Sequence, residues 1–272
     1  MLKRTFSTLI LWSLLLVCVR FLGVPGAVWI ITLVSALTLY ELYALVGRMG
    51  LAPFTWLGLA FGLAMTLAPF YLEPHFTAAD VLALAVVVFS IRILGERETP
   101  NRVETLAWTV FGLVYVPFML QFLVRVLLLT GPHPSTGLVL GVWLIAVTKF
   151  CDTGALLAGL AFGRHRMAPL ISPKKTWEGL AGGVVVSALV GAGLAWGCRA
   201  YLPAGFTPLF GALAALPLAG VGVVADLVES VIKRRADIKD AGQTIPGIGG
   251  VFDLSDSLIL AAPVGWLVFH LL

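Results

Sequence analysis

The segment that decides the fold covers residues 207–234 and reads TPLFGALAALPLAGVGVVADLVESVIKR. Residues 207–225 carry no charged side chain. A helix needs about 20 mostly apolar residues to cross the hydrocarbon core of a bilayer. This segment therefore predicts a membrane-spanning helix whose charged residues begin only in its last turns.

The rest of the chain has the same character. Of its 272 residues, 60% are hydrophobic and 12% are charged, whereas soluble domains carry about 25% charged residues. We expect an all-α, polytopic membrane protein with about nine transmembrane helices, separated by charge, Pro or Gly. The predicted spans cover residues 5–23, 25–46, 54–71, 79–95, 105–129, 137–162, 178–199, 207–231 and 252–271.

Two polar interruptions, 163–177 and 233–250, break this succession of spans. Neither is long enough to bury a core of its own, so any chemistry belongs to the membrane-embedded body. We predict one integral membrane unit, in which residues 1–135 form about five helices and residues 136–272 form about four helices with two cytoplasmic loops. The apolar N-terminal segment is expected to remain as a span rather than to be cleaved as a signal peptide.

The distribution of basic residues predicts the orientation, because loops rich in Lys and Arg stay in the cytoplasm. With the N-terminus cytoplasmic and the C-terminus outside, fourteen of the 18 basic residues lie on the cytoplasmic side. They are Lys3, Arg4, Arg48, Arg92, Arg97, Arg102, Arg164, Arg166, Lys174, Lys175, Lys233, Arg234, Arg235 and Lys239. The net charge of +4 then follows from topology, and nucleic acid is not required as a partner.

The helix quoted above ends in a polar stripe. Asp226, Glu229, Ser230 and Lys233 occupy positions i, i+3, i+4 and i+7, so they project from one helix face. Such a face is unstable against lipid and is expected to line the bundle interior or a water-filled cleft.

A second pair of charges lies in the predicted span 137–162. Lys149 and Asp152 are one helical turn apart and can form an ion pair. Such a pair either neutralises itself inside the bundle or lines a polar cavity, and both interpretations stay open.

Two aspartates begin the last predicted span. Asp253 and Asp256 present two carboxylates on one helix face, which suits Mg²⁺, an ion that takes oxygen ligands and keeps substrate phosphates in its shell. The preceding glycine-rich turn, 245–250, brings backbone N–H groups to a helix N-terminus, where phosphate binds readily. Each feature alone is usually a cap or a turn. Together, beside Asp226 and Asp240, they favour a metal and phosphate site.

The first polar interruption contains two adjacent lysines. Ser172 is predicted to cap a helix that begins at Pro173, which would place Lys174 and Lys175 in the first turn, where the helix dipole disfavours cations. This unfavourable placement suggests that the two lysines bind an anion, such as a triphosphate or a lipid phosphate. As an alternative, they only mark a cytoplasmic loop.

Several ordered motifs between residues 149 and 263 carry a family resemblance. They are Asp152-Thr153-Gly154-Ala155, Phe162-Gly163-Arg164-His165, Ala168-Pro169, Ser172-Pro173-x-Lys175-Thr176-Trp177-Glu178-Gly179, and Ser230-x-x-Lys233-Arg234 through Asp256-Ser257. In these motifs the chain resembles the phosphatidate cytidylyltransferases, also called CDP-diacylglycerol synthases. Two positions of the C-terminal motif depart from the family pattern: Ile248 stands where the family usually has His, and Leu254 stands where it usually has Arg. Elsewhere, Lys174 replaces a common Gly and Leu156 a common Tyr.

The resemblance implies a nucleotidyltransferase of phospholipid biosynthesis, which forms CDP-diacylglycerol and pyrophosphate from CTP and phosphatidic acid. It implies an integral protein of the cytoplasmic (inner) membrane with the active site facing the cytoplasm. Mg²⁺ is the implied cofactor, and a second, monovalent cation stays open. CTP, phosphatidic acid and membrane lipids are the implied partners, nucleic acid is not, and a homodimer stays open.

The site residues that the resemblance implies fall into three groups. The implied catalytic residues are Asp226, Asp240, Asp253, Asp256 and Lys239. The implied substrate and phosphate-binding residues are Ser172, Lys174, Lys175, Thr176, Ser230, Lys233, Arg234, Gly249 and Gly250. The implied metal ligands are Asp226, Asp253, Asp256, Asp240 and Asp152.

Other functions compete with this one. A transporter or channel also carries intramembrane charges, although here the acids gather in the second half instead of repeating between the halves. An inactive, lipid-binding family member would be consistent with Ile248 and Leu254. A CDP-alcohol phosphatidyltransferase would carry an Asp-Gly-x-x-Ala-Arg string, which the sequence lacks.

Overall fold

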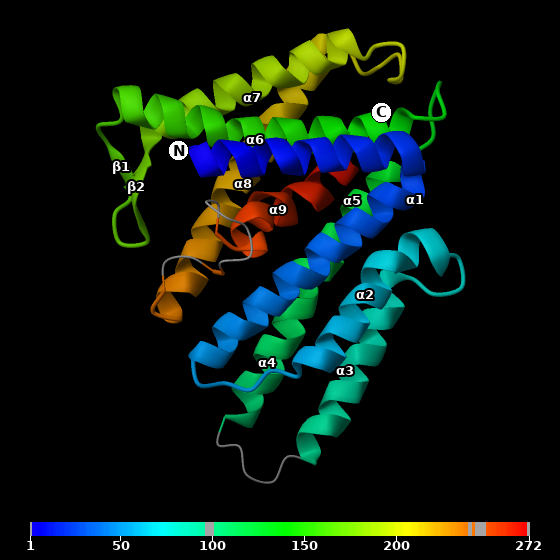
Figure 1. The fold of residues 1–272 in the computed structure, drawn as a ribbon, viewed down its shortest axis with the longest axis vertical. Coiled ribbons are helices and arrows are strands. Elements are labelled where there is room, and N and C mark those ends of the chain that lie inside the picture. Colours follow the sequence, from blue (N-terminus) through cyan, green and yellow to red (C-terminus); the bar gives the residue numbers. More distant parts are fainter. Residues whose placement is uncertain (1, 96–100, 239–240, 243–248, 271–272) are drawn as a thin grey trace. The chain divides into compact units, whose positions relative to one another are not determined.

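Helices make up most of the computed structural model, which describes residues 2–95, 101–238, 241–242 and 249–270 (Figure 1). The all-α prediction is confirmed, with one small β-hairpin added to it. The elements are α1 (Leu2–Arg48), α2 (Thr55–Tyr71), α3 (Ala78–Leu94), α4 (Arg102–Leu113), the π-helix η1 (Val114–Phe118), α5 (Met119–Leu127), α6 (Thr136–Phe162), β1 (Arg166–Ala168), β2 (Ser172–Thr176), α7 (Trp177–Gly197), α8 (Pro208–Arg235) and α9 (Val251–His270).

Six helices in the described part of the chain are long and apolar enough to cross a membrane. They cover Phe21–Arg48, Arg102–Leu127, Thr136–Phe162, Trp177–Gly197, Pro208–Arg235 and Val251–His270. The chain is therefore a polytopic integral membrane protein. The helices α2 and α3, with 17 residues each, are shorter than these six.

The helix α1 contains a break at Gly23, where φ is 59° and ψ is −143°. Side chains disfavour a positive φ, and glycine adopts it without that penalty. Pro25 follows within the same helix. The break lies where the sequence predicts one span to end, at residue 23, and the next to begin.

The segment predicted as one span over 105–129 is built from α4, η1 and α5 in direct succession. The π-helical turn contains Pro117. Because proline has no N–H and its ring clashes with the preceding turn, it disturbs the regular hydrogen-bond ladder. The widened turn accommodates this disturbance without ending the span.

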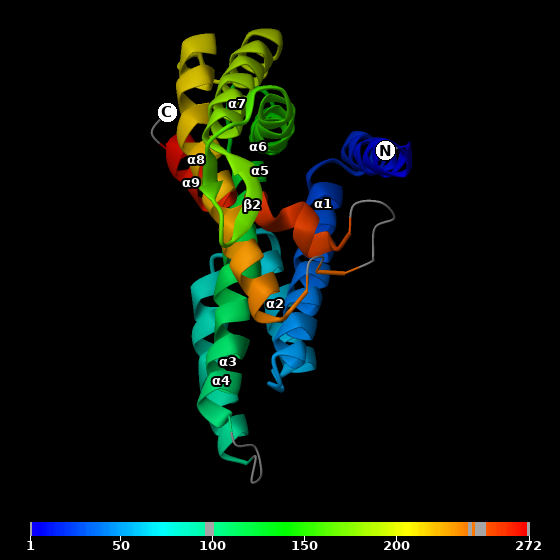
Figure 2. The ribbon, with the colours of Figure 1, turned by 90° about the vertical axis from the view of Figure 1, so that its left-hand side faces the viewer.

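The described chain packs as two compact units. Unit 1 comprises Met1–Arg125 and Ile232–Ser255, and unit 2 comprises Val126–Val231 and Asp256–Leu272. In unit 1, α3 and α4 lie side by side in both ribbon views (Figure 2).

The core of unit 2 includes closely packed α6 and α7, which lie side by side in both views (Figures 1 and 2). Small residues allow this approach: a Cβ added to Gly183 would lie 2.7 Å from the carbonyl oxygen of Cys151. Trp143 is buried in α6 and donates through Nε1 to the carbonyl oxygen of Gly191 in α7, at 2.9 Å. Small residues at such interfaces are typical of membrane helices, where backbones approach closely.

The predicted helix start at Ser172 is wrong. Ser172–Thr176 forms β2, which pairs antiparallel with β1 in unit 2 (Figure 2). Thr176 caps α7 instead, since its hydroxyl accepts a hydrogen bond from the Gly179 N–H at 3.1 Å. Pro173 is tolerated because both strands of a two-stranded sheet are edge strands. The two lysines of β2 therefore do not lie in a helical first turn, and the expected conflict with the helix dipole is absent.

Candidate functional site

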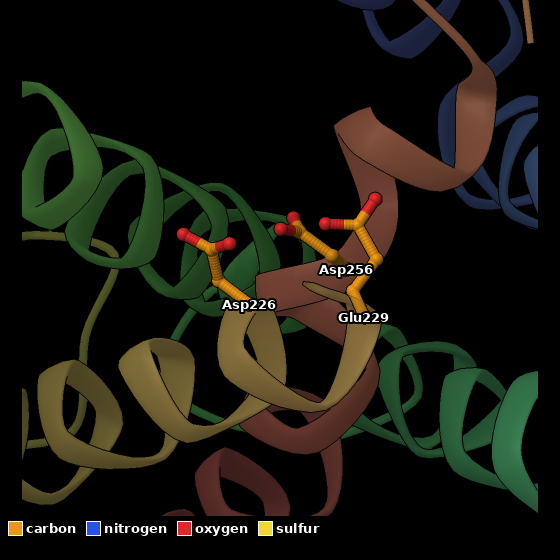
Figure 3. Close-up of side chains that lie close together, drawn as sticks. All are labelled: Asp226, Glu229 and Asp256. Carbon is orange, nitrogen blue, oxygen red and sulfur yellow. The ribbon is translucent and has the colours of Figure 1, made fainter. Parts of the chain in front are cut away.

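Three carboxylates of unit 2 form an acid cluster, which consists of Asp226, Glu229 and Asp256. Asp226 and Glu229 lie one turn apart on α8, and Asp256 comes from α9 (Figure 3). One oxygen from each lies within 4.8 Å of the others, close enough for one cation to contact all three. Glu229 is 2% exposed and Asp256 is 7% exposed.

Two lysines of unit 2 contact these acids. Lys149, in α6, donates to Ser257 Oγ at 2.7 Å, and its Nζ lies 3.6 Å from Asp256 Oδ1. The same Nζ lies 3.5 Å from Asp152 Oδ2, and Ser257 Oγ donates to that oxygen at 3.1 Å. Lys149 and Asp152 thus form the predicted ion pair, and the pair belongs to a polar network rather than standing alone.

The second lysine is Lys175, which projects from β2 to α8. Its Nζ lies 2.6 Å from Asp226 Oδ2. The exposed fractions of the two side chains are 20% for Lys175 and 34% for Asp226, so this pair lies at the accessible edge of the acid cluster. The hairpin that replaces the predicted helix start is what brings Lys175 to this position.

The acid cluster and Asp152 bring four carboxylates into this part of unit 2, and Lys149 and Lys175 pair with three of them, Asp152, Asp226 and Asp256. Buried charges of one sign are unfavourable unless they are paired or bind a metal, and hard oxygen ligands suit Mg²⁺.

Asp253 has different surroundings, within unit 1. Its Oδ1 accepts from Lys233 Nζ at 2.7 Å, and its Oδ2 accepts from the backbone N–H groups of Gly250 at 2.7 Å and Ala241 at 3.1 Å. The bond to Gly250 closes the first turn of α9 in the manner of a capping residue. Both carboxylate oxygens of Asp253 thus have partners from the protein, and its role as a metal ligand stays a prediction.

The other predicted site residues are placed as follows. Ser172 and Lys174 lie in β2, with Lys174 exposed, and Thr176 caps α7. Ser230 is half-buried in α8, and Arg234 is exposed in its last turn. Gly249 has a φ of 123° and Gly250 is buried just before α9. Leu254 is half-buried in α9. The predicted residues Lys239 and Asp240, and the departure at Ile248, lie outside the described residues.

The structure draws attention to two acidic residues that the predicted site residues do not include. Glu229 belongs to the polar stripe that the sequence reveals, but the ligand motif that the resemblance implies does not include it. Glu41, in α1, is 6% exposed and accepts a hydrogen bond from the Phe252 N–H at 2.8 Å. An acidic residue inside an apolar span is the signal that points to both.

Comparison with known proteins identifies the family. The model of the cytidylyltransferase family matches residues 2–272. A phosphatidate cytidylyltransferase of Synechocystis sp. is 33% identical over 257 residues, which covers 86% of this chain and 85% of that protein. One from Mycobacterium bovis is 34% identical over 180 residues, covering 65% of this chain and 55% of that protein. Phosphatidate cytidylyltransferase 5, chloroplastic, of Arabidopsis thaliana is 33% identical over 273 residues, covering 88% of this chain and 65% of that protein.

The length of the match differs among these relatives. The chain spans about half the length of the mycobacterial proteins, with 55% of the Mycobacterium bovis protein and 51% of the Mycobacterium tuberculosis protein covered. The family model, in contrast, matches the chain from residue 2 to residue 272. This chain therefore belongs to the cytidylyltransferase family.

Proposed function

We propose that this chain is a CTP:phosphatidate cytidylyltransferase, which forms CDP-diacylglycerol and pyrophosphate in phospholipid biosynthesis. The observation that carries the proposal is the group of four carboxylates and two lysines that unit 2 holds among its membrane-spanning helices. Family membership and the relatives named phosphatidate cytidylyltransferase support the choice of CTP and phosphatidic acid as substrates.

The reaction makes one phosphorus–oxygen bond and breaks another. An oxygen of the lipid phosphate attacks the α-phosphorus of CTP, and the bond from that phosphorus to the oxygen bridging the β-phosphate breaks, so that pyrophosphate leaves. Both substrates are anions. The protein must therefore supply mainly charge neutralisation and in-line positioning, and no side-chain nucleophile is needed.

The acid cluster fits a divalent cation. Asp226, Glu229 and Asp256 offer hard oxygen ligands within 4.8 Å of one another. When bound, Mg²⁺ would neutralise phosphate charge and align the two substrates. Asp152 is a further candidate because Ser257 and Lys149 hold it beside Asp256. Asp253 and Asp240 remain ligand candidates on the resemblance alone.

The basic residues supply phosphate contacts in this proposal. Lys175 pairs with Asp226, so a cation bound by Asp226 would release the lysine toward a substrate phosphate. Lys233 is held by Asp253 in unit 1. The remaining candidates for phosphate binding are Ser172, Lys174, Thr176, Ser230, Arg234, Lys239, Gly249 and Gly250.

The proposed orientation has nine spans, with the N-terminus in the cytoplasm and the active site facing it. Six helices meet the length and composition of a span. The segment of α1 before Gly23, together with α2 and α3, would supply three more. A helix of 17 residues is about 25 Å long, which is near the lower limit for crossing a bilayer. This arrangement keeps most lysines and arginines in the cytoplasm, where CTP is available, and corresponds to the inner membrane.

A direct assay tests the proposed activity. The full chain, purified in detergent, is mixed with CTP labelled at its α-phosphate, phosphatidic acid and Mg²⁺, and the lipid phase is analysed for label. We expect labelled CDP-diacylglycerol and an equal amount of pyrophosphate, and no product when phosphatidic acid is omitted or EDTA is added. A folded protein that forms no CDP-diacylglycerol under these conditions would instead support the alternative of an inactive lipid-binding protein. The family match counts against the transporter alternative.

A further inference from the structure

Glu41 is a buried carboxylate that the proposed chemistry does not use. It lies in α1, within the candidate span Phe21–Arg48, and is 6% exposed. Burying a carboxylate among apolar helices is costly unless other groups stabilise its charge. The groups that contact Glu41 therefore indicate what it does.

Glu41 contacts the beginning of α9, which belongs to the same unit. Its Oε2 accepts a hydrogen bond from the Phe252 N–H at 2.8 Å. The first N–H groups of a helix have no partner within the helix, and the helix N-terminus favours negative charge. One turn away on each helix, Thr38 Oγ1 and Ser255 Oγ form a hydrogen bond of 2.7 Å. Two contacts thus fix the register of α1 against the first turns of α9.

Glu41 also contacts two glycines that flank the residues 243–248. A Cβ added to Gly242 would lie 2.7 Å from Glu41 Oε1, and a Cβ added to Gly250 would overlap Glu41 Oε2. The same Cβ on Gly250 would lie 2.9 Å from the Gly242 N–H nitrogen. Only residues without a side chain let the carboxylate and the two backbone segments approach this closely.

We propose that Glu41 is a positioning residue for the cytidylyltransferase reaction, through which the N-terminal helix α1 holds the start of α9 and both flanks of residues 243–248. The proposal rests on the function proposed above. Asp253, in the same first turn, holds Lys233 at 2.7 Å, and Gly249 and Gly250 are candidate phosphate-binding residues. Loss of Glu41 frees this turn and displaces those groups from the nucleotide. Displacements of about 1 Å can lower a rate by about 100-fold.

The test compares Glu41→Ala and Glu41→Gln with Glu104→Gln, a control that alters an exposed glutamate of α4 in the same unit. We expect Glu41→Ala to lower kcat/KM for CTP by about 100-fold. Glu41→Gln should lower it by about tenfold, because the amide oxygen still accepts a hydrogen bond but carries no charge. The KM for phosphatidic acid should stay within about twofold, and the melting temperature within about 4 °C.

A second variant tests the geometry. Gly242→Ala places a methyl group 2.7 Å from Glu41 Oε1 and should lower the activity of the wild-type protein. In the Glu41→Ala protein this contact is removed and the next atom, Gly250 Cα, lies 3.3 Å away, so the double variant should be little worse than Glu41→Ala alone. Such non-additivity is expected of residues in contact.

The outcomes separate the two proposals. An active wild type with unchanged CTP kinetics in Glu41→Ala overturns this inference alone. Equal losses for both substrates, accompanied by a large drop in melting temperature, overturn it as well, because they indicate a role in stability only. A wild type that forms no CDP-diacylglycerol overturns the proposed function and this inference with it.

Discussion

Lys149 Nζ lies 3.6 Å from Asp256 Oδ1, so α6 supplies an ammonium group to an acid of α9. The same ammonium group donates to Ser257, the residue that follows Asp256. Asp256 Oδ1 also accepts a hydrogen bond from the Ser257 N–H at 2.6 Å, so this carboxylate has two polar contacts although it is only 7% exposed. Asp256 thus lies beside Asp226 and Glu229, the two acids that could hold one cation together with it.

We expect Asp226→Asn and Asp256→Asn each to lower kcat by at least about 100-fold, or about 2.7 kcal/mol in barrier height. Each change removes one charged oxygen ligand and keeps the size of the side chain. The Mg²⁺ concentration for half-maximal activity should also rise. Initial rates over a Mg²⁺ titration measure both effects, with Glu104→Gln as the control. Unchanged rates and unchanged Mg²⁺ dependence in both variants would exclude these residues as ligands.

Asp253→Asn should behave differently, because Asp253 is bonded to Lys233 and to two backbone N–H groups. Removing one partner of a buried ion pair destabilises a protein by about 3 kcal/mol. We therefore expect a lower melting temperature for Asp253→Asn than for Asp226→Asn, in addition to any loss of activity.

The control for this variant is Asp237→Asn, which changes an exposed aspartate of the same unit with a positive φ of 55°. Asparagine tolerates that backbone conformation, so the melting temperature of Asp237→Asn should equal that of the wild type. A melting temperature of Asp253→Asn equal to that of the control would show that the capping contacts of Asp253 contribute little.

The packing of α6 against α7 provides a prediction about stability. A Cβ on Gly182 would overlap Cβ of Ala158, whereas a Cβ on Gly193, further along α7, would meet no atom within 4 Å. Gly182→Ala should therefore destabilise the protein by about 1–3 kcal/mol through overpacking, and Gly193→Ala should be neutral or slightly stabilising. Thermal unfolding in one detergent compares the two. Equal melting temperatures of the two variants would mean that α6 and α7 can move apart to accommodate the added methyl group without loss of stability.

The membrane character and part of the candidate site could be predicted from local sequence. Apolar runs of about 20 residues identify spans without any knowledge of packing. The spacing of Asp226 and Glu229 places both on one face of any helix, and the structure brings them together with Asp256.

The remaining features depend on contacts between distant segments. Ser172 and Pro173 have the local chemistry of a helix start, but pairing with β1 makes this segment a strand. The contacts of Lys149 with Asp256 and of Glu41 with Phe252 join residues far apart in the chain. No local pattern encodes such contacts, because they form only when the helices pack.

The orientation of the chain can be checked by labelling. In a background with Cys18, Cys151 and Cys198 changed to Ser, we expect Lys174→Cys to react with a membrane-impermeant maleimide only from the cytoplasmic side. His270→Cys should react only from outside, because an odd number of spans separates the termini. Detergent-opened vesicles provide the control in which both react. Labelling of Lys174→Cys from outside alone would reverse the orientation and separate the proposed active site from CTP.

Ile248 is the departure from the family pattern that bears most directly on activity, and it lies outside the described residues. The glycine-rich sequence around this position, with Gly247, Gly249 and Gly250, suggests that backbone N–H groups rather than a side chain would approach phosphate here. If so, the side chain at position 248 contributes little, and Ile248→His should leave CDP-diacylglycerol formation within about tenfold of wild type, a barrier change of about 1.4 kcal/mol or less. Mg²⁺-dependent pyrophosphate release, measured for both proteins with phosphatidic acid in detergent micelles, provides the comparison.

An inactive wild type that becomes active in Ile248→His would show that the histidine is essential to the chemistry and that this chain has lost the activity. We expect an active wild type, because Asp226, Glu229 and Asp256 are all present and lie within 4.8 Å of one another, close enough to bind one cation.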